Sequence, residues 1–445
     1  MKKINQTNHI LYVFEHDLRL EDNLTFNKAC ELSRKNNFNL MCLYCFQPWY
    51  LNSLSLSETV IGRARFKFLR QSLSDLKEQL AAKGLSLSVR IGSVSDVISS
   101  LHNRYLFHSI FYSSSAGYNE NKQWHKLVYQ FEDVEFKQFS TNTLFEPDRL
   151  PFKIFELPKH FTPFRKKVEA LTLDLPIKSL DTTLNGVEDE SDQWCMLFSV
   201  ASNEVDESDF KGGERAGQKH LNNYFSEESP STYKTTRNNL LGWQSSTKFS
   251  PWLALGCISP IQIMQCLKIY EEKYGTNEST YWIYFELLWR EFFHWNAHKQ
   301  GQGLFQSKSR VEWRHDESYD TQEFRQWKAG RTGQPLIDAC MRELNQTGYL
   351  SNRGRQIAAS YLIHELGLDW QLGASYFECM LIDYDVASNW GNWQYIAGVG
   401  ADPRGGRHFN VEKQQQIHDP EGKYVRRWSE VETTDVYVLG ADLIV

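Results

Sequence analysis

Residues 40–46 read LMCLYCF, and residues 57–83 read SETVIGRARFKFLRQSLSDLKEQLAAK. The first stretch is an apolar run rich in β-forming residues. The second carries apolar side chains at helical spacing, at Ala64, Phe68, Leu69, Leu76 and Leu80. Gly84 then ends the helical pattern, and another apolar run follows at residues 85–89. Because parallel strands need a crossover that is usually a helix, this order predicts a β-α-β unit.

The same alternation continues in both directions along residues 9–139. Apolar runs of strand character lie at residues 10–14, 40–46, 85–89, 109–112 and 134–139. Five strands alternating with helices predict a doubly wound, parallel, five-stranded α/β domain over residues 1–139. No GxGxxG follows the first strand, so a Rossmann-type dinucleotide site is not expected.

An interdomain linker is expected over residues 140–210. Its first part is rich in proline, at positions 147, 151, 158, 163 and 176. Residues 181–210 hold nine acids and no Lys or Arg, which is the composition of a solvated segment. Part of the linker is expected to pack on the domains through Phe152, Phe155, Phe161 and Phe164. Without the nine acids the net charge of −6 becomes +3, so global charge does not exclude a basic groove.

Residues 211–445 are expected to form a helical domain. Helix-compatible apolar spacing recurs at residues 214–226, 259–274, 280–299, 321–329, 334–346, 352–366 and 371–381. Eleven of the 14 tryptophans follow residue 240. Tryptophans are common around planar ligands, although core packing is the simpler account of any single one. The two halves of the chain are therefore expected to perform different tasks.

The bulk properties predict a soluble cytoplasmic protein. No apolar run approaches the roughly 18 residues of a membrane span, and the eight cysteines show no disulfide-framework spacing. Cys42 and Cys45 form a CxxC inside an apolar run, which favours buried packing. Glu291, His294 and His298 share a helical spacing without an HExxH motif, so no metal site is expected.

One predicted helix carries an unusual face at residues 281–293. Glu286, Trp289, Arg290 and Phe293 follow one another at i, i+3, i+4 and i+7. A carboxylate, an indole and a guanidinium on one stripe can recognise a flat heterocycle by hydrogen bonding and stacking. The alternative, which periodicity alone favours, is an amphipathic helix with a Glu–Arg pair at its margin.

Three other segments present polar groups. SNRGRQ at residues 351–356 places two arginines at a helix start, which suits phosphate or carboxylate binding. SSTKFSP at residues 245–251 is a cluster of hydroxyl side chains followed by a proline at an expected helix start. Such a cluster is suited to binding phosphate oxygens. IDYDVASNWGNWQY at residues 382–395 has two acids two positions apart, which predicts a turn that presents polar groups; a simple capped turn is the alternative.

Taken in order, these segments resemble the photolyase/cryptochrome family, and more closely its DASH cryptochrome branch. The resemblance runs from FEHDLRLEDN at residues 14–23 to YVRRW at residues 424–428. Its most specific motifs are GGERA at 212–216, SPWLALGCISP at 250–260, GRTGQPLIDA at 330–339 and NRGRQ at 352–356. The resemblance implies an N-terminal α/β antenna domain, a long interdomain loop and a C-terminal helical domain that holds FAD.

The resemblance also implies the residues that bind FAD. They are Tyr233, Ser246, Thr247, Lys248, Phe249, Ser250, Arg290, Arg355, Asp383, Tyr384, Asp385 and Asn389. Arg355 would pair with Asp383, and Asn389 would face N5 of the flavin. These roles agree with the charges of the groups. Arg355 would offset the charge of the buried carboxylates, and the neutral amide of Asn389 is compatible with an anionic reduced flavin.

The implied enzyme is a deoxyribodipyrimidine photolyase that splits cyclobutane pyrimidine dimers with blue light. Glu286, Trp289 and Asn389 would be catalytic, and the bases would contact Glu286, Trp289, Asn352, Arg353, Gln356 and Tyr395. Trp393, Trp370 and Trp313 match the tryptophan chain that photoreduces the flavin. Gln356 and Tyr395 depart from ordinary dimer photolyases and imply a preference for single-stranded DNA, with duplex DNA or RNA as further partners. A monomer is expected.

The resemblance also implies an antenna cofactor, and the sequence leaves alternative functions open. Asn119 and Glu120 match a folate-contacting pair, which implies 5,10-methenyltetrahydrofolate as the antenna. The main alternative is a non-repairing blue-light photoreceptor that binds nucleic acid or a protein partner. A light-independent flavoprotein oxidoreductase is disfavoured by the missing dinucleotide fingerprint.

Overall fold

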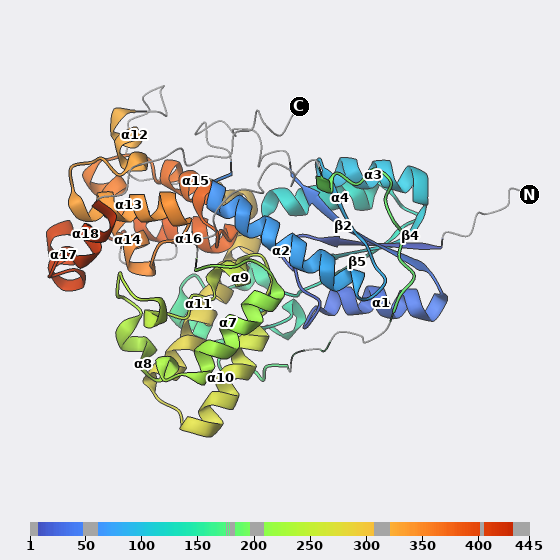
Figure 1. Ribbon diagram of the computed structural model, residues 1–445, viewed down its shortest axis with the longest axis horizontal. Helices are drawn as coiled ribbons and strands as arrows, with labels where there is room; N and C mark the ends of the chain where they lie inside the picture. Colours follow the sequence, from blue (N-terminus) through green and yellow to red (C-terminus); the bar gives the residue numbers. More distant parts are fainter. Residues whose placement is uncertain are drawn as a thin grey trace, which may run out of the picture.

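Five parallel strands in the order β3-β2-β1-β4-β5 form the N-terminal sheet (Figure 1). They are β1 (His9–Phe14), β2 (Asn39–Phe46), β3 (Leu87–Ile91), β4 (Phe107–Ser113) and β5 (Glu135–Phe139). The computed structural model describes residues 8–47, 61–174, 176, 178, 183–195, 209–306, 321–400 and 405–429. The predicted doubly wound parallel sheet is confirmed.

Helices cover both faces of this sheet. On one face lie α1 (Leu24–Asn36) and α2 (Arg63–Ala81), and on the other lie α3 (Val94–Tyr105) and α4 (Tyr118–Gln130). Because side chains alternate along a strand, Cys42 joins the core on the α1–α2 side and Cys45 joins the core on the α3–α4 side. The two thiols of the CxxC therefore point to opposite faces of the sheet and pack in separate cores.

The second half of the described chain is helical and lies beside the sheet domain (Figure 1). Its helices are α7 (Glu214–Ser226), α8 (Ser229–Thr236), α9 (Ser250–Ala254), α10 (Pro260–Tyr274), α11 (Glu278–Gln300), α12 (Gln322–Ala329), α13 (Pro335–Thr347), α14 (Asn352–Ser360), α15 (Trp370–Met380), α16 (Val386–Ala397), α17 (Val411–His418) and α18 (Lys423–Ser429). Helix α2 of the first half contacts α7 and α15, so it joins the two parts.

The seven predicted helical segments are confirmed, with ends shifted by a few residues. The segment 352–366 changes character within its length, since α14 continues as a π-helix over Tyr361–Glu365. The turn predicted at the two acids is present, but it is only the start of α16. Asp385 caps that helix by accepting a hydrogen bond from the backbone N–H of Ser388 at 2.7 Å.

The linker is folded over much of its described length. It forms 3₁₀ turns at Pro147–Arg149 and Ile154–Glu156 and then the helix α5 (Phe161–Val168). Phe161 and Phe164 are buried, as expected, and Phe152 is half-buried against the core. Phe155, by contrast, is 69% exposed, so it does not anchor the linker.

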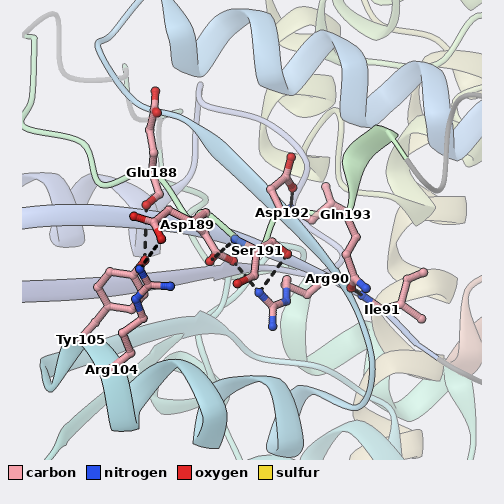
Figure 2. Close-up of polar contacts among 11 residues, drawn as sticks. Arg90, Ile91, Arg104, Tyr105, Glu188, Asp189, Ser191, Asp192 and Gln193 are labelled. Atoms are coloured by element: carbon pink, nitrogen blue, oxygen red, sulfur yellow. Dashed lines mark hydrogen bonds and ion pairs between the residues drawn. The ribbon is translucent and has the colours of Figure 1, made fainter.

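The acidic part of the linker lies along the free edge of β3, as Figure 2 shows for residues 188–193. We call residues 183–195 the edge segment. Asp189 forms an ion pair with Arg90 at 3.0 Å, and its own side chain is 1% exposed. Asp192 and Gln193 accept hydrogen bonds from the backbone N–H groups of Val89 and Ile91, at 2.6 and 2.7 Å. Glu188, Glu190 and Asp192 are exposed, as expected of a solvated segment, whereas Asp189 is buried. The segment nevertheless lies in order along the sheet and pairs an edge that would otherwise be open.

Buried charged groups join the two halves of the protein. The guanidinium of Arg19, which is fully buried, donates to the carbonyl oxygen of Gly256 at 2.8 Å. In return, Glu214 accepts hydrogen bonds from the backbone N–H groups of Leu20 and Glu21 at 2.8 and 2.9 Å. Each of these charged groups is hydrogen-bonded across the junction, which holds the helical part in a fixed position against the sheet domain.

Candidate functional site

A cavity of about 220 Å³ lies among α9, α14, α15 and α16. Eight predicted site residues line it: Ser250, Asn352, Arg355, Gln356, Asp383, Asp385, Asn389 and Trp393. Ser351 caps α14 by accepting a hydrogen bond from the N–H of Gly354 at 3.1 Å, so the helix begins at Asn352. Asn352, Arg355 and Gln356 then follow at i, i+3 and i+4, which directs all three to one face.

An ion pair organises the floor of this main cavity. Arg355 contacts Asp383 at 2.7 Å, and the Asp383 side chain is 2% exposed. Arg355 also donates through Nε to the carbonyl oxygen of Leu350 at 2.8 Å, which fixes its direction. The second carboxylate oxygen of Asp383, Oδ1, is buried and has no hydrogen-bond partner among the described residues. A buried acceptor of this kind calls for a donor on a bound molecule.

Asp385 is the N-cap of α16, and Asn389 stands on the first turn of this helix. Asn389 is 8% exposed and donates from its amide nitrogen to the carbonyl oxygen of Ala374 at 2.9 Å. The bond fixes the amide plane of Asn389 at the cavity wall. Asp385 lines the main cavity and also a smaller cavity at the junction with the sheet domain.

The predicted phosphate-binding loop is only partly in the main cavity. Ser250 lines it, whereas Lys248 lines a neighbouring cavity of about 700 Å³, and Tyr349 lines both. Lys248 has a φ of 54°, and its ammonium lies 4.6 Å from the centre of the Tyr349 ring. Thr247 accepts a hydrogen bond at its carbonyl oxygen from the ring of His220 at 2.8 Å. Of the other predicted contacts, Ser246 is half-buried, and Tyr233 and Phe249 are buried.

The predicted base-contacting residues Glu286 and Trp289 lie on α11, and neither lines the main cavity as described. Glu286 forms an ion pair with Arg237 at 2.8 Å, with side-chain exposures of 31% and 16%. Burial raises the pKa of Glu286, and the nearby Arg237 opposes that rise. Sequence reasoning missed Arg237, which follows the short polar helix α8; its only local signal is its spacing of four residues from Tyr233.

Trp289 is held between aromatic rings. It stacks on Phe161 of the linker helix α5 with ring centres 3.8 Å apart and planes 13° apart. Tyr395 meets it edge-on at 6.0 Å and accepts a hydrogen bond from Arg407 at 2.5 Å. The structure therefore brings Trp289 and Tyr395 together, as the site prediction requires.

Arg353 lies apart from the other residues of its motif. Its guanidinium donates to Asn238 at 3.3 Å and lies 5.6 Å from the centre of the Phe409 ring. Its Nε is buried without a hydrogen-bond partner among the described residues. Arg353 therefore does not line the main cavity.

The tryptophans predicted for electron transfer are placed as follows. Trp393 lines the main cavity, and Trp370, at the start of α15, is fully buried. Trp313 lies outside the residues that the structure describes. Two tryptophans that sequence reasoning left without a role are close to these: Trp327 lies 6.4 Å from Trp393, and Trp390 lies 5.8 Å from Trp370, between ring centres.

Arg290, Tyr384 and Glu120 meet in the smaller junction cavity, of about 40 Å³. Arg290 donates to the carbonyl oxygen of Asn142 at 2.5 Å, so it bridges the helical part and the linker. Asn119, the other predicted antenna contact, is exposed. Three predicted flavin contacts and one predicted antenna contact therefore share this cavity, and one of the three, Asp385, lines the main cavity as well.

Glu291, His294 and His298 do not gather around an open position. Glu291 accepts hydrogen bonds from the N–H of Leu144 and from Trp295, at 2.9 and 2.8 Å. Burial lowers the pKa of His298 to about 4, and its ring lies 3.3 Å from that of His294, nitrogen to nitrogen. Within the described ranges, no group of three or more His, Cys, Asp or Glu side chains is arranged to hold a metal ion.

The titration of Glu15 near the junction gives a stability prediction. Burial raises the pKa of Glu15 to about 8, and its carboxylate accepts a hydrogen bond from Trp124 at 2.9 Å. A raised folded-state pKa adds stability that is complete below pH ~4.5 and is lost as the pH rises through about 8. Glu15→Gln keeps an acceptor for Trp124 and removes the titration. We expect the variant to gain about 3.5 kcal/mol relative to the parent between pH 5 and pH 8.

Urea unfolding of both proteins across this range measures the difference directly. The comparison isolates Glu15, because other buried carboxyls are common to the two proteins. Unfolding free energies that run parallel for parent and variant from pH 5 to pH 8 would contradict the assignment.

Comparison with known proteins identifies the family. Residues 10–181 match the family model for DNA photolyase, and residues 282–435 match that for the FAD binding domain of DNA photolyase. The chain is 45% identical to a cryptochrome DASH of Idiomarina loihiensis, over 94% of this chain and 92% of the relative. The chain belongs to the photolyase/cryptochrome family, in its DASH branch.

Solved structures of this family share the fold. A cryptochrome of Synechocystis sp. superimposes with a TM-score of 0.87 at 39% identity, covering 94% of this chain and 88% of that one. A class III photolyase of Agrobacterium tumefaciens gives a TM-score of 0.79 at 26% identity, covering 95% and 86%. Among the residues that the structure describes, no helix is long and apolar enough to cross a membrane.

The main cavity fits the FAD that the family's domain binds. The unpartnered Oδ1 of Asp383 offers an acceptor to an N–H or hydroxyl group, and Arg355 balances the carboxylate charge. Ser250 and Asn389 add polar contacts at the wall, and Trp393 adds an aromatic surface. A planar, hydrogen-bonding cofactor therefore finds both its polar and its stacking partners here.

Proposed function

We propose that this chain is a blue-light-dependent FAD photolyase of DASH type that splits cyclobutane pyrimidine dimers, with a preference for single-stranded DNA. One observation carries the proposal: a single cavity joins residues assigned to the flavin with residues assigned to the bases. Asp383 and Asn389 represent the first set, and Asn352 and Gln356 represent the second. Such a cavity lets a base that has left the helix lie against the cofactor.

Bound FAD supplies the light absorption and the one-electron chemistry of this reaction. The chain's own residues bind and orient the two partners. Arg355 would fix Asp383 beside the cofactor through their ion pair, and the fixed amide of Asn389 presents a neutral group at the cavity wall. We assign these positions as the flavin contacts, together with Ser250 and Asp385.

The substrate would be held from the α11 and α14 sides. The indole of Trp289, backed by Phe161, offers a flat and rigid surface for the dimer. Glu286 would accept hydrogen bonds from the pyrimidine N–H groups, and Arg237 keeps this carboxylate in place. A dimer stacks poorly in DNA and is cheap to extrude, which contributes to selectivity.

The domain assignment forms part of the same proposal. Residues 1–139 would bind the antenna, residues 140–210 would link the domains, and residues 211–445 would bind FAD and DNA. Glu120 lines the junction cavity, which supports a pterin-containing antenna such as 5,10-methenyltetrahydrofolate at that junction. We also propose that the chain acts as a monomer.

A repair assay tests the proposal. Chemically reduced holoprotein is illuminated with blue light in the presence of an oligonucleotide that contains one thymine dimer, in single-stranded and in duplex form. We expect intact thymines to reappear, and faster in the single-stranded form, because extrusion from duplex DNA costs a few kcal/mol. The dark reaction and free reduced FAD are the controls.

Two results of this assay would contradict the proposal. Equal repair of both forms would remove the preference for single strands. Absence of repair from both forms, with flavin still photoreduced, would remove the enzymatic function and favour the non-repairing photoreceptor.

A further inference from the structure

Trp390 lies beside Trp370 and Trp393, two of the tryptophans expected to photoreduce the flavin. It stands on α16 three residues before Trp393, so the two side chains are neighbours on the helix surface. Its ring meets that of Trp370 edge-on, with centres 5.8 Å apart and planes 80° apart. Trp390 is 6% exposed and is also packed against Phe305 at 4.9 Å. Aromatic contact at this distance permits rapid electron exchange between Trp370 and Trp390.

The indole N–H groups of this cluster have different partners. The Nε1 of Trp370 has no hydrogen-bond partner among the described residues. The Nε1 of Trp327 donates to the backbone carbonyl oxygen of Ala358 at 3.2 Å. The Nε1 of Trp390 donates to the carboxylate of Glu378 at 2.9 Å. Of these three tryptophans, Trp390 has an N–H partner that can keep a proton.

The difference matters because an indole that has lost an electron is a much stronger N–H acid than a neutral indole. Proton transfer needs an acceptor within about 2.6–3.2 Å, and the Trp390–Glu378 contact meets this condition. A backbone carbonyl oxygen accepts a hydrogen bond but does not retain the proton. An oxidised Trp370 or Trp327 therefore stays a cation, whereas an oxidised Trp390 can become neutral.

We propose that Trp390 is a further electron donor in flavin photoreduction and that Glu378 takes its indole proton. The proposal rests on the flavin photochemistry proposed above and names a donor for it. Trp393 gives an electron to the light-excited oxidised flavin and is refilled through Trp370, which takes an electron from Trp390. The N–H bond of Trp390 breaks, and its proton forms an O–H bond on Oε2 of Glu378. The pair has then lost one electron, leaving a neutral tryptophanyl radical and a neutral carboxylic acid.

The surroundings of Glu378 favour retention of that proton. Burial raises the pKa of Glu378, against the opposing effects of hydrogen bonds from Trp390 and Tyr384 and of the charge of Arg65. The charge of Glu120, which lines the same junction cavity as Glu378, raises it further. Once Glu378 is protonated, return of the electron to Trp390 requires the proton to move back as well, which slows recombination.

Flash photolysis of the oxidised holoprotein tests the proposal. The absorption and electron paramagnetic resonance spectra distinguish the neutral tryptophanyl radical from the radical cation. We expect the parent to form a long-lived neutral radical whose formation slows in D₂O. We expect Trp390→Phe to abolish this signal. In Glu378→Gln, which keeps an acceptor for Trp390, a radical cation should form and decay about a hundredfold faster, as for loss of a positioned proton acceptor.

Trp327→Phe is the matched control, because Trp327 is fully buried and lies 6.4 Å from Trp393 but donates to a carbonyl oxygen. Its radical kinetics should equal those of the parent. The indole ¹⁵N–¹H signal of Trp390 gives a readout independent of light: it should move upfield in Glu378→Gln. Flavin content and thermal unfolding establish that each variant is folded.

The experiment distinguishes failure of the Trp390–Glu378 assignment from failure of the proposed flavin photochemistry. If Trp390→Phe keeps the long-lived neutral radical, or if Glu378→Gln leaves its lifetime unchanged, the assignment is overturned while flavin photoreduction stands. If the parent forms reduced flavin without any tryptophan radical, the assignment is also overturned. If the flash produces neither reduced flavin nor a tryptophan radical in the parent, the proposed photochemistry is overturned as well.

Discussion

Arg355→Ala is expected to weaken the binding of FAD. The substitution leaves the carboxylate of Asp383, whose side chain is 2% exposed, without the cation that lies 2.7 Å away. An uncompensated buried charge costs several kcal/mol, and the 26% exposure of the Arg355 side chain reduces this cost through solvent screening. We expect FAD to bind about thirtyfold more weakly, equivalent to about 2 kcal/mol. Titration of the apoprotein with FAD, followed by quenching of flavin fluorescence, measures the change.

Two further variants separate the effect of losing the Arg355 charge from a general effect on folding. Arg355→Lys keeps the positive charge but not the bond from Nε to the carbonyl oxygen of Leu350, so it should lose less affinity than Arg355→Ala. Adding Asp383→Asn to Arg355→Ala removes the unpaired charge and should recover part of the loss. Unchanged FAD affinity in Arg355→Ala, with a normal melting temperature, would show that this ion pair does not support the cofactor.

Glu286→Ala is expected to reduce repair strongly while FAD stays bound. Glu286 lies on α11 outside the lining of the main cavity and is held by Arg237 at 2.8 Å. Hydrogen bonds to a charged group contribute about 1.5–3 kcal/mol, so we expect repair per absorbed photon at low substrate to fall by about tenfold to a hundredfold. The flavin spectrum should not change. The measurement is dimer repair at limiting substrate, with dimer binding measured separately in the dark.

A matched control is available on the same helix. Glu278 stands at the first turn of α11, is exposed and pairs with Lys234 at 3.0 Å. Glu278→Ala should leave repair unchanged, because an exposed ion pair contributes little. If Glu286→Ala instead releases the flavin, Glu286 is a cofactor contact and its assignment to the substrate is wrong.

The part of the site that could be predicted from the sequence is local in the chain. The spacing of Asn352, Arg355 and Gln356 places them on one helix face, and that face lines the main cavity. The polar turn at Asp383 and Asp385 was predicted from residues two positions apart, although the helix that Asp385 caps was not. Local spacing is readable because helix and turn geometry fix it directly.

Contacts between distant segments could not be predicted in this way. Arg237 follows a short polar helix and reaches Glu286 only through the packing of α8 on α11. The acidic edge segment has the composition of solvated chain, and its partners Arg90 and Arg104 come from β3 and α3, far earlier in the sequence. Trp390 looks like any core aromatic until Glu378 is placed beside its N–H. In each case the decisive partner is supplied by the tertiary fold.

The stacking of Phe161 on Trp289 limits where the chain can be divided when its domains are exchanged with those of a relative. The ring of Phe161 belongs to the linker, yet it forms one wall of the surface against which Trp289 is fixed. The ring of Phe164 from the same helix lies 5.4 Å from that of Phe292, on the same helix as Trp289. A chimera that exchanges the antenna domain must therefore keep α5 with the helical half. A cut placed after α5 would give the recombined protein a substrate surface from one parent and its backing from the other.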